Sequence, residues 1–361
     1  MRVATWLRLG FWVVLAVATI EVAARVDDWV TQGASPFGNY DVSIIQDYDA
    51  LGPRGKPGSR FGKWRINSDG YRGPDLKPGT TRILTLGASE TFGLYESENH
   101  EWPQLLAAEL NRRLARPVYQ AANAASAGET FATTIKRLPG HLNAVRPAAA
   151  VIYPSFANYL VVPFLSGPPR AAPRQRFQLR LEARVKQLLK EALPDPVQTR
   201  IRAWQTERAA KQYKEIWTDM PAALQRRFRE EMEQAIGILR DHGVEVFLVT
   251  HTTRFGERVA PDERDMLISW RKSYPMLAEE GFLPMERTMN DILRETGKRM
   301  GVHVIDVVRE MPAGRRYYSD FVHFTDEGAE RFAHLVAEGM IRTATSAAFR
   351  GPAPDQASIS P

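Results

Sequence analysis

The chain has 361 residues, a size that suits one large α/β domain with an insertion, or two small domains. Apolar residues make up 44% and charged residues 25%, and the formal charge of +6 favours anionic partners without requiring them. The absence of cysteine excludes disulfides, cysteine-based zinc sites and a cysteine nucleophile.

The N-terminus carries a short apolar run, Leu9–Ile20, which follows Arg2 and Arg8 and is closed by Glu21 and Arg25. Apolar residues on every face, with basic residues before them, predict an uncleaved signal anchor over residues 1–28. The alternative is a cleaved signal peptide with its small-residue site in Ala16–Ala18. We expect a single-pass protein of the inner (plasma) membrane, with its main domain, residues 29–345, facing the periplasm or exterior.

Residues 27–78 are polar and rich in glycine and proline, which predicts a stalk and an irregular lead-in. Within them, residues 65–73 predict a hairpin with a Ser-Asp-Gly turn beside the first core strand. Continuous apolar runs then alternate with helical patterns, which predicts an α/β fold: a three-layer, doubly wound, parallel five-stranded sheet. The expected strands are 82–86, 118–122, 149–153, 244–250 and 302–306, and the expected helices are 101–114, 132–142, 228–241, 285–300 and 326–344.

A helical insertion, at about residues 160–220, interrupts this alternation. Two basic helical patterns, 175–193 and 199–217, fit a solvated helical pair, a lid beside the active site, or a surface for an anionic polymer or lipid headgroups. Residues 346–361 are expected to form a disordered tail.

Candidate catalytic residues lie at two distant points of the chain. Ser89 follows the first core strand, where open α/β sheets bind ligands. Asp320 and His323 follow the last strand, before a helix with Thr325 as its expected N-cap. A loop of this length can bring the carboxylate onto imidazole Nδ1 and leave Nε2 for the serine. This arrangement predicts a Ser-His-Asp triad, although Ser89 alone would be read as a helix cap.

The sequence resembles the SGNH/GDSL hydrolases, and its lead-in resembles their membrane-anchored bacterial branch. Gly87-Ala88-Ser89 resembles the family's Gly-Asp-Ser block, residues 123–128 its second block, Asn158 the asparagine of its third, and Asp320 with His323 its last. The resemblance covers about residues 66–340 apart from the insertion, and implies the flavodoxin-like SGNH fold. It also implies an oxyanion hole made by Ser89 N–H, Ala125 N–H and the Asn158 amide.

Three positions depart from the family pattern. Ala88 replaces aspartate, Ala125 replaces glycine, and the third block lacks its glycine and its acid. Three further side chains near these blocks are possible substrate contacts: Glu90, Glu129 and His251. Loop-stabilising roles for the two acids, and a polar loop role for the histidine, remain open.

These observations predict a serine esterase that forms an acyl-enzyme, acting on O-acyl groups of cell-envelope or exported polysaccharide or on another ester. An O-acetyltransferase that uses the same triad is the alternative, and a degenerate polysaccharide-binding or assembly module is the second. The sequence implies no metal and no organic cofactor. It contains no phosphate-binding Gly-Lys-Ser/Thr motif and no nucleic-acid-binding motif, and it leaves the oligomeric state open.

Overall fold

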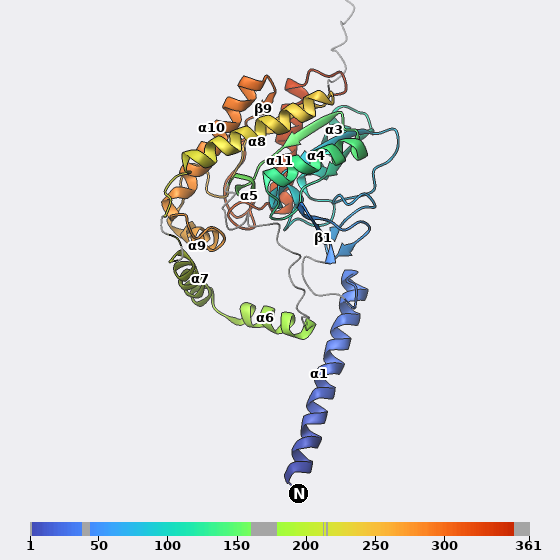
Figure 1. Ribbon diagram of the computed structural model, residues 1–361, viewed down its shortest axis with the longest axis vertical. Helices are drawn as coiled ribbons and strands as arrows, with labels where there is room; N and C mark the ends of the chain where they lie inside the picture. Colours follow the sequence, from blue (N-terminus) through green and yellow to red (C-terminus); the bar gives the residue numbers. More distant parts are fainter. Residues whose placement is uncertain (1, 38–43, 160–178, 212, 214–215, 350–361) are drawn as a thin grey trace, which may run out of the picture.

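A parallel five-stranded sheet forms the centre of the computed structural model, which describes residues 2–37, 44–159, 179–211, 213 and 216–349 (Figure 1). The spatial order is β6-β5-β7-β8-β9, and Leu86 pairs with Ile152 at the carboxyl end of the β5–β7 ladder. The order reverses direction at β5, so its end is a topological switch point. The strands are β5 (Thr81–Leu86), β6 (Tyr119–Asn123), β7 (Ala149–Ile152), β8 (Glu245–Val249) and β9 (His303–Ile305).

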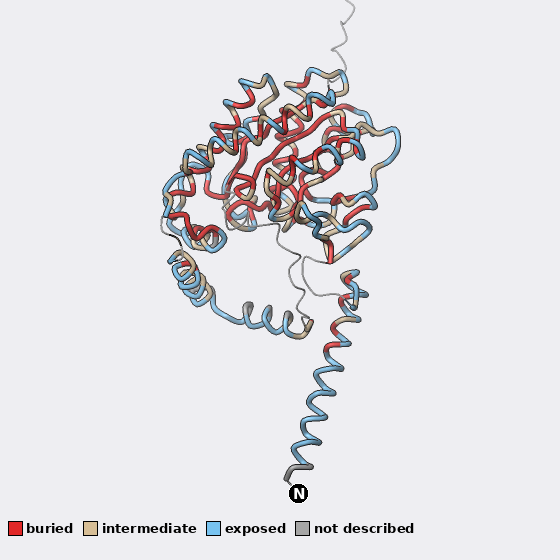
Figure 2. Tube along the Cα trace, in the orientation of Figure 1, coloured by how far each residue is buried: buried red, intermediate tan, exposed pale blue. Residues whose placement is uncertain are grey.

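Helices cover both faces of the sheet and complete the three predicted layers. One face carries α3 (Trp102–Arg113) and α11 (Asp326–Thr343), whose apolar residues share a buried cluster with Ile83 and Phe247. The other carries α4 (Phe131–Val145), α8 (Ala222–Asp241) and α10 (Phe282–Met300). Figure 2 shows this buried core in red. The predicted fold class is confirmed, with element ends displaced by a few residues.

The lead-in is more regular than predicted. It forms two small antiparallel pairs, β1 (Gln46–Asp49) with β2 (Gly52–Gly55), and β3 (Arg60–Phe61) with β4 (Trp64–Arg65). The predicted hairpin of residues 65–73 exists as a bridge between Ile66 and Arg72. It joins the sheet at Asn123 of edge strand β6 rather than at the first core strand.

The N-terminal helix α1 (Arg2–Gln32) extends away from the body as a single rod (Figure 1). Its residues Thr5–Gln32 are long and apolar enough to cross a membrane, a test that a signal sequence also passes. The helix runs four residues past the predicted boundary at residue 28. Glu21 and Arg25, one helical turn apart, form an ion pair, with Arg25 Nε and Glu21 Oε1 2.6 Å apart.

The insertion forms α6 (Arg180–Ala192) and α7 (Asp195–Ala210), while residues 160–178 lie outside the described part. The sequence reasoning missed α9 (Arg264–Ser273), which packs against α7 and buries Trp270 completely. In Figure 1, α6 and α7 form an arc from α1 to α9. The remaining elements are α2 (Ser89–Phe92), α5 (Phe156–Tyr159), and the short 3-10 helices η2 (Pro261–Glu263) and η3 (Glu279–Gly281).

Residues 346–349, which the sequence analysis assigns to the tail, pack against the domain. Phe349 is fully buried, stacks on Tyr119 and meets Phe247 edge-on. Packing of this aromatic side chain therefore continues the ordered domain to residue 349. Residues 350–361 lie outside the described part of the chain.

Candidate active site

Ser89 lies where β5 ends and the four-residue helix α2 begins. A Cβ on Gly87 would collide with the Thr91 side chain and the Tyr153 carbonyl oxygen, so the tight turn before Ser89 requires glycine. The turn is closed by Phe92 N–H, which donates to the Ala88 carbonyl at 2.8 Å. The serine therefore occupies the predicted place at the carboxyl edge of the sheet.

Asp320 and His323 form a closed pair in the loop between β9 and α11. His323 Nδ1 is 2.8 Å from Asp320 Oδ2, while Asp320 Oδ1 accepts the backbone N–H groups of Val322 and His323 at 3.0 and 2.9 Å. Thr325 caps α11 as predicted, accepting Gly328 N–H at 3.1 Å. His323 Nε2 is buried and has no hydrogen-bond partner among the described residues.

The environment favours the charged forms of both members of this pair. Burial by itself would lower the pKa of His323, but the Asp320 carboxylate, and then the charges of Glu90 and Glu96, raise the pKa above its usual 6.5. Burial would likewise raise the pKa of Asp320, but its hydrogen bond to His323 keeps that pKa below its usual 3.8.

The segment after α2 holds the His323 loop against the Ser89 side of the sheet. Ser97 donates its backbone N–H and its hydroxyl to Asp326 at 2.7 and 2.6 Å, which fixes the first turn of α11. The Tyr95 ring meets the His323 ring edge-on, with centroids 5.3 Å apart. Two loops separated by more than 200 residues are thereby joined at one edge of the sheet.

The hydroxyl of Ser89 donates to Glu90 Oε2 at 2.9 Å rather than to His323. Glu90 is buried and its Oε1 lies 3.7 Å from His251 Nε2, within ion-pair range but beyond a hydrogen bond. On the other side of the ring, His251 Nδ1 lies 3.4 Å from Glu286 Oε1. The side chains of Glu286, His251 and Glu90 thus form a buried row of contacts that ends at the hydroxyl of Ser89, the candidate nucleophile.

Opposite charges stabilise each other within this buried row of side chains. Burial alone would lower the pKa of His251, but its interactions with Glu286 and Glu90 raise it. Burial alone would raise the pKa of Glu90, but His251 and His323 lower it. The His251 ring also stacks on Tyr153, with an interplanar angle of 13°. His251 therefore supports the interior behind Ser89, and its side chain is fully buried.

The three expected oxyanion donors are engaged to different degrees. Ser89 N–H lies in the first turn of α2, where a helix has no acceptor for it. Ala125 N–H donates to Asn123 Oδ1 at 3.3 Å. Asn158 Nδ2 donates one hydrogen to the Glu129 carbonyl at 3.0 Å, and a side-chain amide carries a second. Asn158 Oδ1 accepts Ser155 N–H at 2.9 Å, which fixes the orientation of the amide.

The departures from the family pattern are accommodated locally. Ala125 does not have a positive φ, so its Cβ causes no backbone strain. That side chain packs in a small cluster with Phe92 and Ile66. Ala88 is fully buried and fills its place in the turn without a capping hydrogen bond.

Glu129, the third possible substrate contact, is buried and accepts the Thr134 hydroxyl at 3.1 Å through Oε1. Burial raises its pKa to about 8, so this side chain is a neutral acid at pH 7. All three possible contacts therefore lie in the interior, and Glu90 alone is hydrogen-bonded to a proposed triad member.

Sequence reasoning missed Arg72, a buried side chain from the lead-in. It donates to the carbonyl oxygens of Phe92, Gly93 and Glu96, and its Nη2 lies 3.5 Å from Glu101 Oε2. Phe92 ends α2, and Gly93 and Glu96 lie in the segment that follows it. The only signal was the lead-in motif itself, which contains Arg72.

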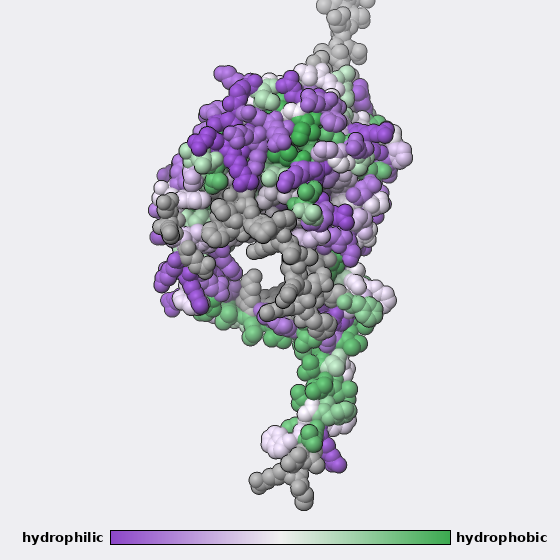
Figure 3. Space-filling view, viewed as in Figure 1, coloured by the Kyte–Doolittle hydropathy of each residue, from purple (hydrophilic) through white to green (hydrophobic). Residues whose placement is uncertain are grey.

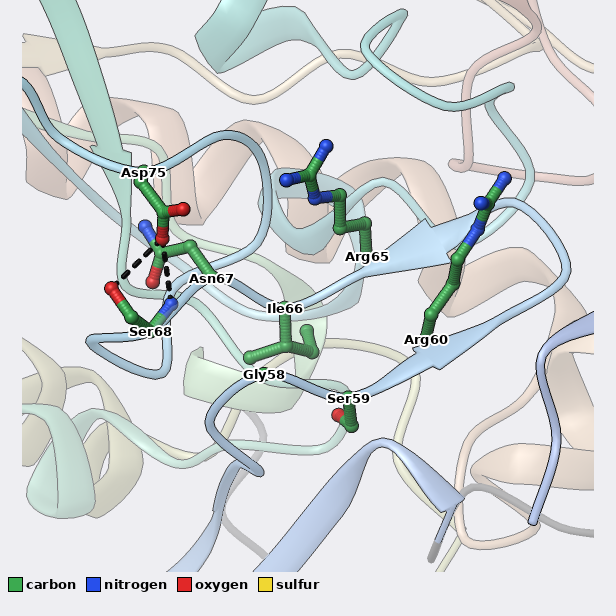
Figure 4. A pocket seen from close by; sticks show the side chains of 8 residues that line it. All are labelled: Gly58, Ser59, Arg60, Arg65, Ile66, Asn67, Ser68 and Asp75. Atoms are coloured by element: carbon green, nitrogen blue, oxygen red, sulfur yellow. Dashed lines mark hydrogen bonds between the residues drawn. The ribbon is translucent and has the colours of Figure 1, made fainter.

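A surface pocket of the lead-in lies apart from this chemistry. Figure 4 shows Asp75 beside Ser68, whose N–H and hydroxyl both donate to Oδ1 at 2.8 Å. No proposed catalytic or oxyanion residue lines this pocket. In the part of the chain that the structure describes, no group of three or more acidic or histidine side chains is placed to hold a metal ion.

Comparisons with known proteins found no matching family model and no matching curated protein. Among solved structures, the chain is similar to a GDSL-like lipase from Bacteroides thetaiotaomicron, with 12% identity, 73% of this chain and 88% of that chain covered, and a TM-score of 0.41. It is similar to a lipase/acylhydrolase from Enterococcus faecalis, with 16% identity, coverages of 72% and 95%, and a TM-score of 0.39. It is also similar to an acetyl xylan esterase, with 13% identity, coverages of 72% and 100%, and a TM-score of 0.41.

Proposed function

We propose that the chain is a serine esterase that works through an acyl-enzyme, with Ser89 as nucleophile and His323 as base. Asp320 orients the imidazole and stabilises the imidazolium that forms when His323 accepts the proton. The observation that carries this proposal is the 2.8 Å contact between Asp320 and His323, which leaves a buried Nε2 without a partner among the described residues. A base in this state can accept the proton of a serine hydroxyl.

The proposed reaction begins when Ser89 Oγ exchanges its hydrogen bond from Glu90 to His323 Nε2. Oγ then attacks the acyl carbonyl carbon while its proton moves to Nε2. The resulting oxyanion is held by the N–H groups of Ser89 and Ala125 and the amide of Asn158. Collapse breaks the ester bond, and His323 returns the proton to the leaving alcohol. Water, deprotonated by the same imidazole, then attacks the acyl-enzyme. The acyl–Oγ bond breaks, His323 returns the proton to Ser89 Oγ, and the acid is freed.

We further propose that α1 anchors the domain in the inner membrane and that the substrate is an O-acyl group on an exported polysaccharide. The length and apolar surface of α1 support the anchor. The substrate class rests on the expected orientation, which places the site on the side of the membrane where exported polymers are found.

A non-catalytic binding module is the second candidate, and one feature of the site favours it. The Ser89 hydroxyl donates to Glu90, Ala125 N–H donates to Asn123, and the Asn158 amide donates to Glu129. Each of these bonds must be exchanged or supplemented before the site can hold an oxyanion. A degenerate site that kept the fold would have the same appearance.

The test is p-nitrophenyl acetate hydrolysis by the detergent-solubilised full chain, together with labelling by a fluorophosphonate probe. Ser89→Ala and His323→Ala should abolish turnover, and Ser89→Ala should abolish labelling. Matched controls are Ser273→Ala and His242→Ala, which change exposed side chains and should leave both signals intact. If the native chain is not labelled and does not exceed the rate of its Ser89→Ala variant, the binding module replaces the esterase.

A second measurement separates a transferase from a hydrolase. Acyl transfer to added oligosaccharide is measured beside the release of free acid.

A further inference from the structure

The insertion helix α6 is attached to the N-terminal helix α1 by buried polar contacts. The carboxylate of Glu21 accepts the backbone N–H groups of Arg180 and Leu181 at 2.9 and 3.0 Å, so a side chain of α1 caps the first turn of α6. The Arg180 side chain is fully buried, with Nε 3.4 Å from Asp28 Oδ2. Arg184 adds contacts at 2.6 and 2.8 Å to Asp27 and Asp28.

These contacts fix the depth of α6 relative to the membrane that α1 is proposed to span. Glu21 comes directly after Ile20, the last residue of the charge-free apolar run. Residues Thr5–Ile20, which include the charged Arg8 before that run, rise about 24 Å as an α-helix, and a bilayer's hydrocarbon core is about 30 Å thick. The edge of the hydrocarbon core therefore lies close to the junction at which α6 begins. Figure 1 shows α6 leading away from α1 across its axis, as a helix lying along a membrane surface would.

The outer face of α6 is apolar and exposed. Val185, Leu188 and Leu189 follow helical spacing, and the side chains of the two leucines are more than 60% exposed. Leu193 and Val197 continue the exposed apolar surface into the start of α7. Figure 3 shows green atoms along the lower edge of α6, continuous with the green surface of α1.

Basic side chains accompany this apolar face. Residues 180–210 contain seven arginines and lysines against four acids, and two of the seven, Arg180 and Arg184, are paired with acids of α1. Arg200 lines a groove with Val197, Ile201 and Trp204, and the Arg208 guanidinium lies over the Trp204 ring at 5.6 Å. Apolar residues beside excess basic residues are typical of helices that lie in the interface of an anionic bilayer.

We propose that α6, with the start of α7, docks on the same bilayer that α1 crosses. It would insert Val185, Leu188, Leu189, Leu193 and Val197 among the lipid chains and turn the basic residues that are not paired with α1 toward anionic headgroups. The continuity with α1 distinguishes a lipid surface from a protein partner, because the capping contacts hold this face level with the hydrocarbon edge. This inference rests on the proposed membrane anchor and is independent of the proposed catalysis. Its consequence is that the domain has a second attachment, which limits its rotation about the stalk.

The absence of native cysteine allows a direct test with single labels. Leu188→Cys and Val197→Cys are labelled with an environment-sensitive fluorophore in the full chain, reconstituted in nanodiscs of phosphatidylcholine and phosphatidylglycerol that contain doxyl-labelled lipid. Val13→Cys, in the middle of α1, is the positive control. Glu230→Cys, exposed on α8, is the control for a solvated helix. We expect blue-shifted emission and doxyl quenching at residues 188, 197 and 13, with neither effect at residue 230.

The possible failures are distinguishable. If residue 13 is quenched while residues 188 and 197 behave like residue 230, docking is wrong and the anchor stands. If residue 13 is not quenched either, the anchor fails and the docking proposal fails with it. A blue shift at residue 188 without doxyl quenching would show burial against protein and overturn the lipid assignment. Equal quenching after removal of phosphatidylglycerol would overturn the role given to the basic residues.

Discussion

At the scale of single residues, the proposed reaction requires the Ser89 hydroxyl to change its hydrogen-bond acceptor. In the structure the hydroxyl donates its hydrogen bond to Glu90, whereas in the proposed reaction it must donate to His323. Glu90 also contributes to the raised pKa of His323, because its negative charge favours the imidazolium form. The same carboxylate thus competes with the base for the serine and makes the base stronger.

Asp320→Asn should lower kcat by about 10⁴-fold, the scale found when the carboxylate of a Ser-His-Asp triad is replaced by an amide. The Asp320 hydrogen bond and charge are the main terms that raise the pKa of His323, so the variant's imidazole loses its proton at lower pH. The residual kcat/KM should therefore have its acid limb at lower pH than the native profile. A profile of unchanged shape and height would remove Asp320 from the triad.

Glu90→Gln should move the acid limb of kcat/KM in the same direction with a much smaller loss of rate. A neutral amide no longer stabilises the imidazolium, so the pKa of His323 falls toward its usual value. Glu98→Gln is the matched control, since its partner is the exposed Arg60 at 2.9 Å. If both variants give the native pH profile, the charge of Glu90 does not act on His323.

How much of the site can be predicted from the sequence depends on how far apart its residues lie along the chain. Asp320 and His323 are three residues apart, and the structure confirms their predicted contact. Ser89 could be placed beside them because parallel strands end at one edge of the sheet. The contact between His251 and Glu286 could not be predicted, because it depends on how α10 packs against the end of β8.

At the scale of elements, the lead-in acts as a clamp on the active-site loop. Arg72 extends from the 65–73 hairpin into the body and donates to carbonyl oxygens at the end of α2 and in the segment after it. Buried guanidinium groups need such partners, because desolvation is costly for a charge without them. Through Arg72, the lead-in helps to hold in place the segment that contains Ser89, although the sequence of the lead-in is polar and was predicted to be irregular.

Arg72→Ala should destabilise the fold by about 3–5 kcal/mol, because it leaves buried Glu101 and several carbonyls without their partner. Urea unfolding monitored by tryptophan fluorescence gives the change in free energy. Arg60→Ala is the matched control, because its ion pair with Glu98 is exposed and such pairs contribute about 0–1 kcal/mol. Equal losses from the two variants would show that the buried clamp adds nothing to stability.

The core elements were predictable because each has a strong local pattern. The buried strands are continuous apolar runs, and the observed strands fall within a few residues of those runs. Helix α9 was missed because its apolar residues form one short run, Met266–Trp270, between charged residues, and only the packing of Trp270 in the core shows that this run is helical and buried. The attachment of α6 to α1 depends on contacts about 160 residues apart, which no local pattern records.

At the scale of the whole molecule, buried acids make stability depend on pH. Burial raises the pKa of Glu129 to about 8 and that of Glu96 to about 7, both from a usual value of 4.5. Between these values the folded state holds protons that the unfolded state has released. The free energy of unfolding contributed by these groups therefore falls as pH rises from about 4.5, and it levels off above the folded-state pKa.

Glu129→Gln isolates the larger of these two effects, because glutamine keeps the shape of the neutral acid and an oxygen to accept the Thr134 hydroxyl. The difference in unfolding free energy, variant minus native, should grow from about pH 5 to pH 8 by up to about 1.4 kcal/mol per pH unit, the limit for one proton. Urea unfolding of both full chains in detergent, at half-unit steps of pH, measures this difference. The variant should be the more stable protein at pH 8, because it avoids ionising a carboxyl in the interior. Parallel curves for the two proteins would mean that Glu129 titrates alike in the folded and unfolded states, and that its burial is relieved by solvent.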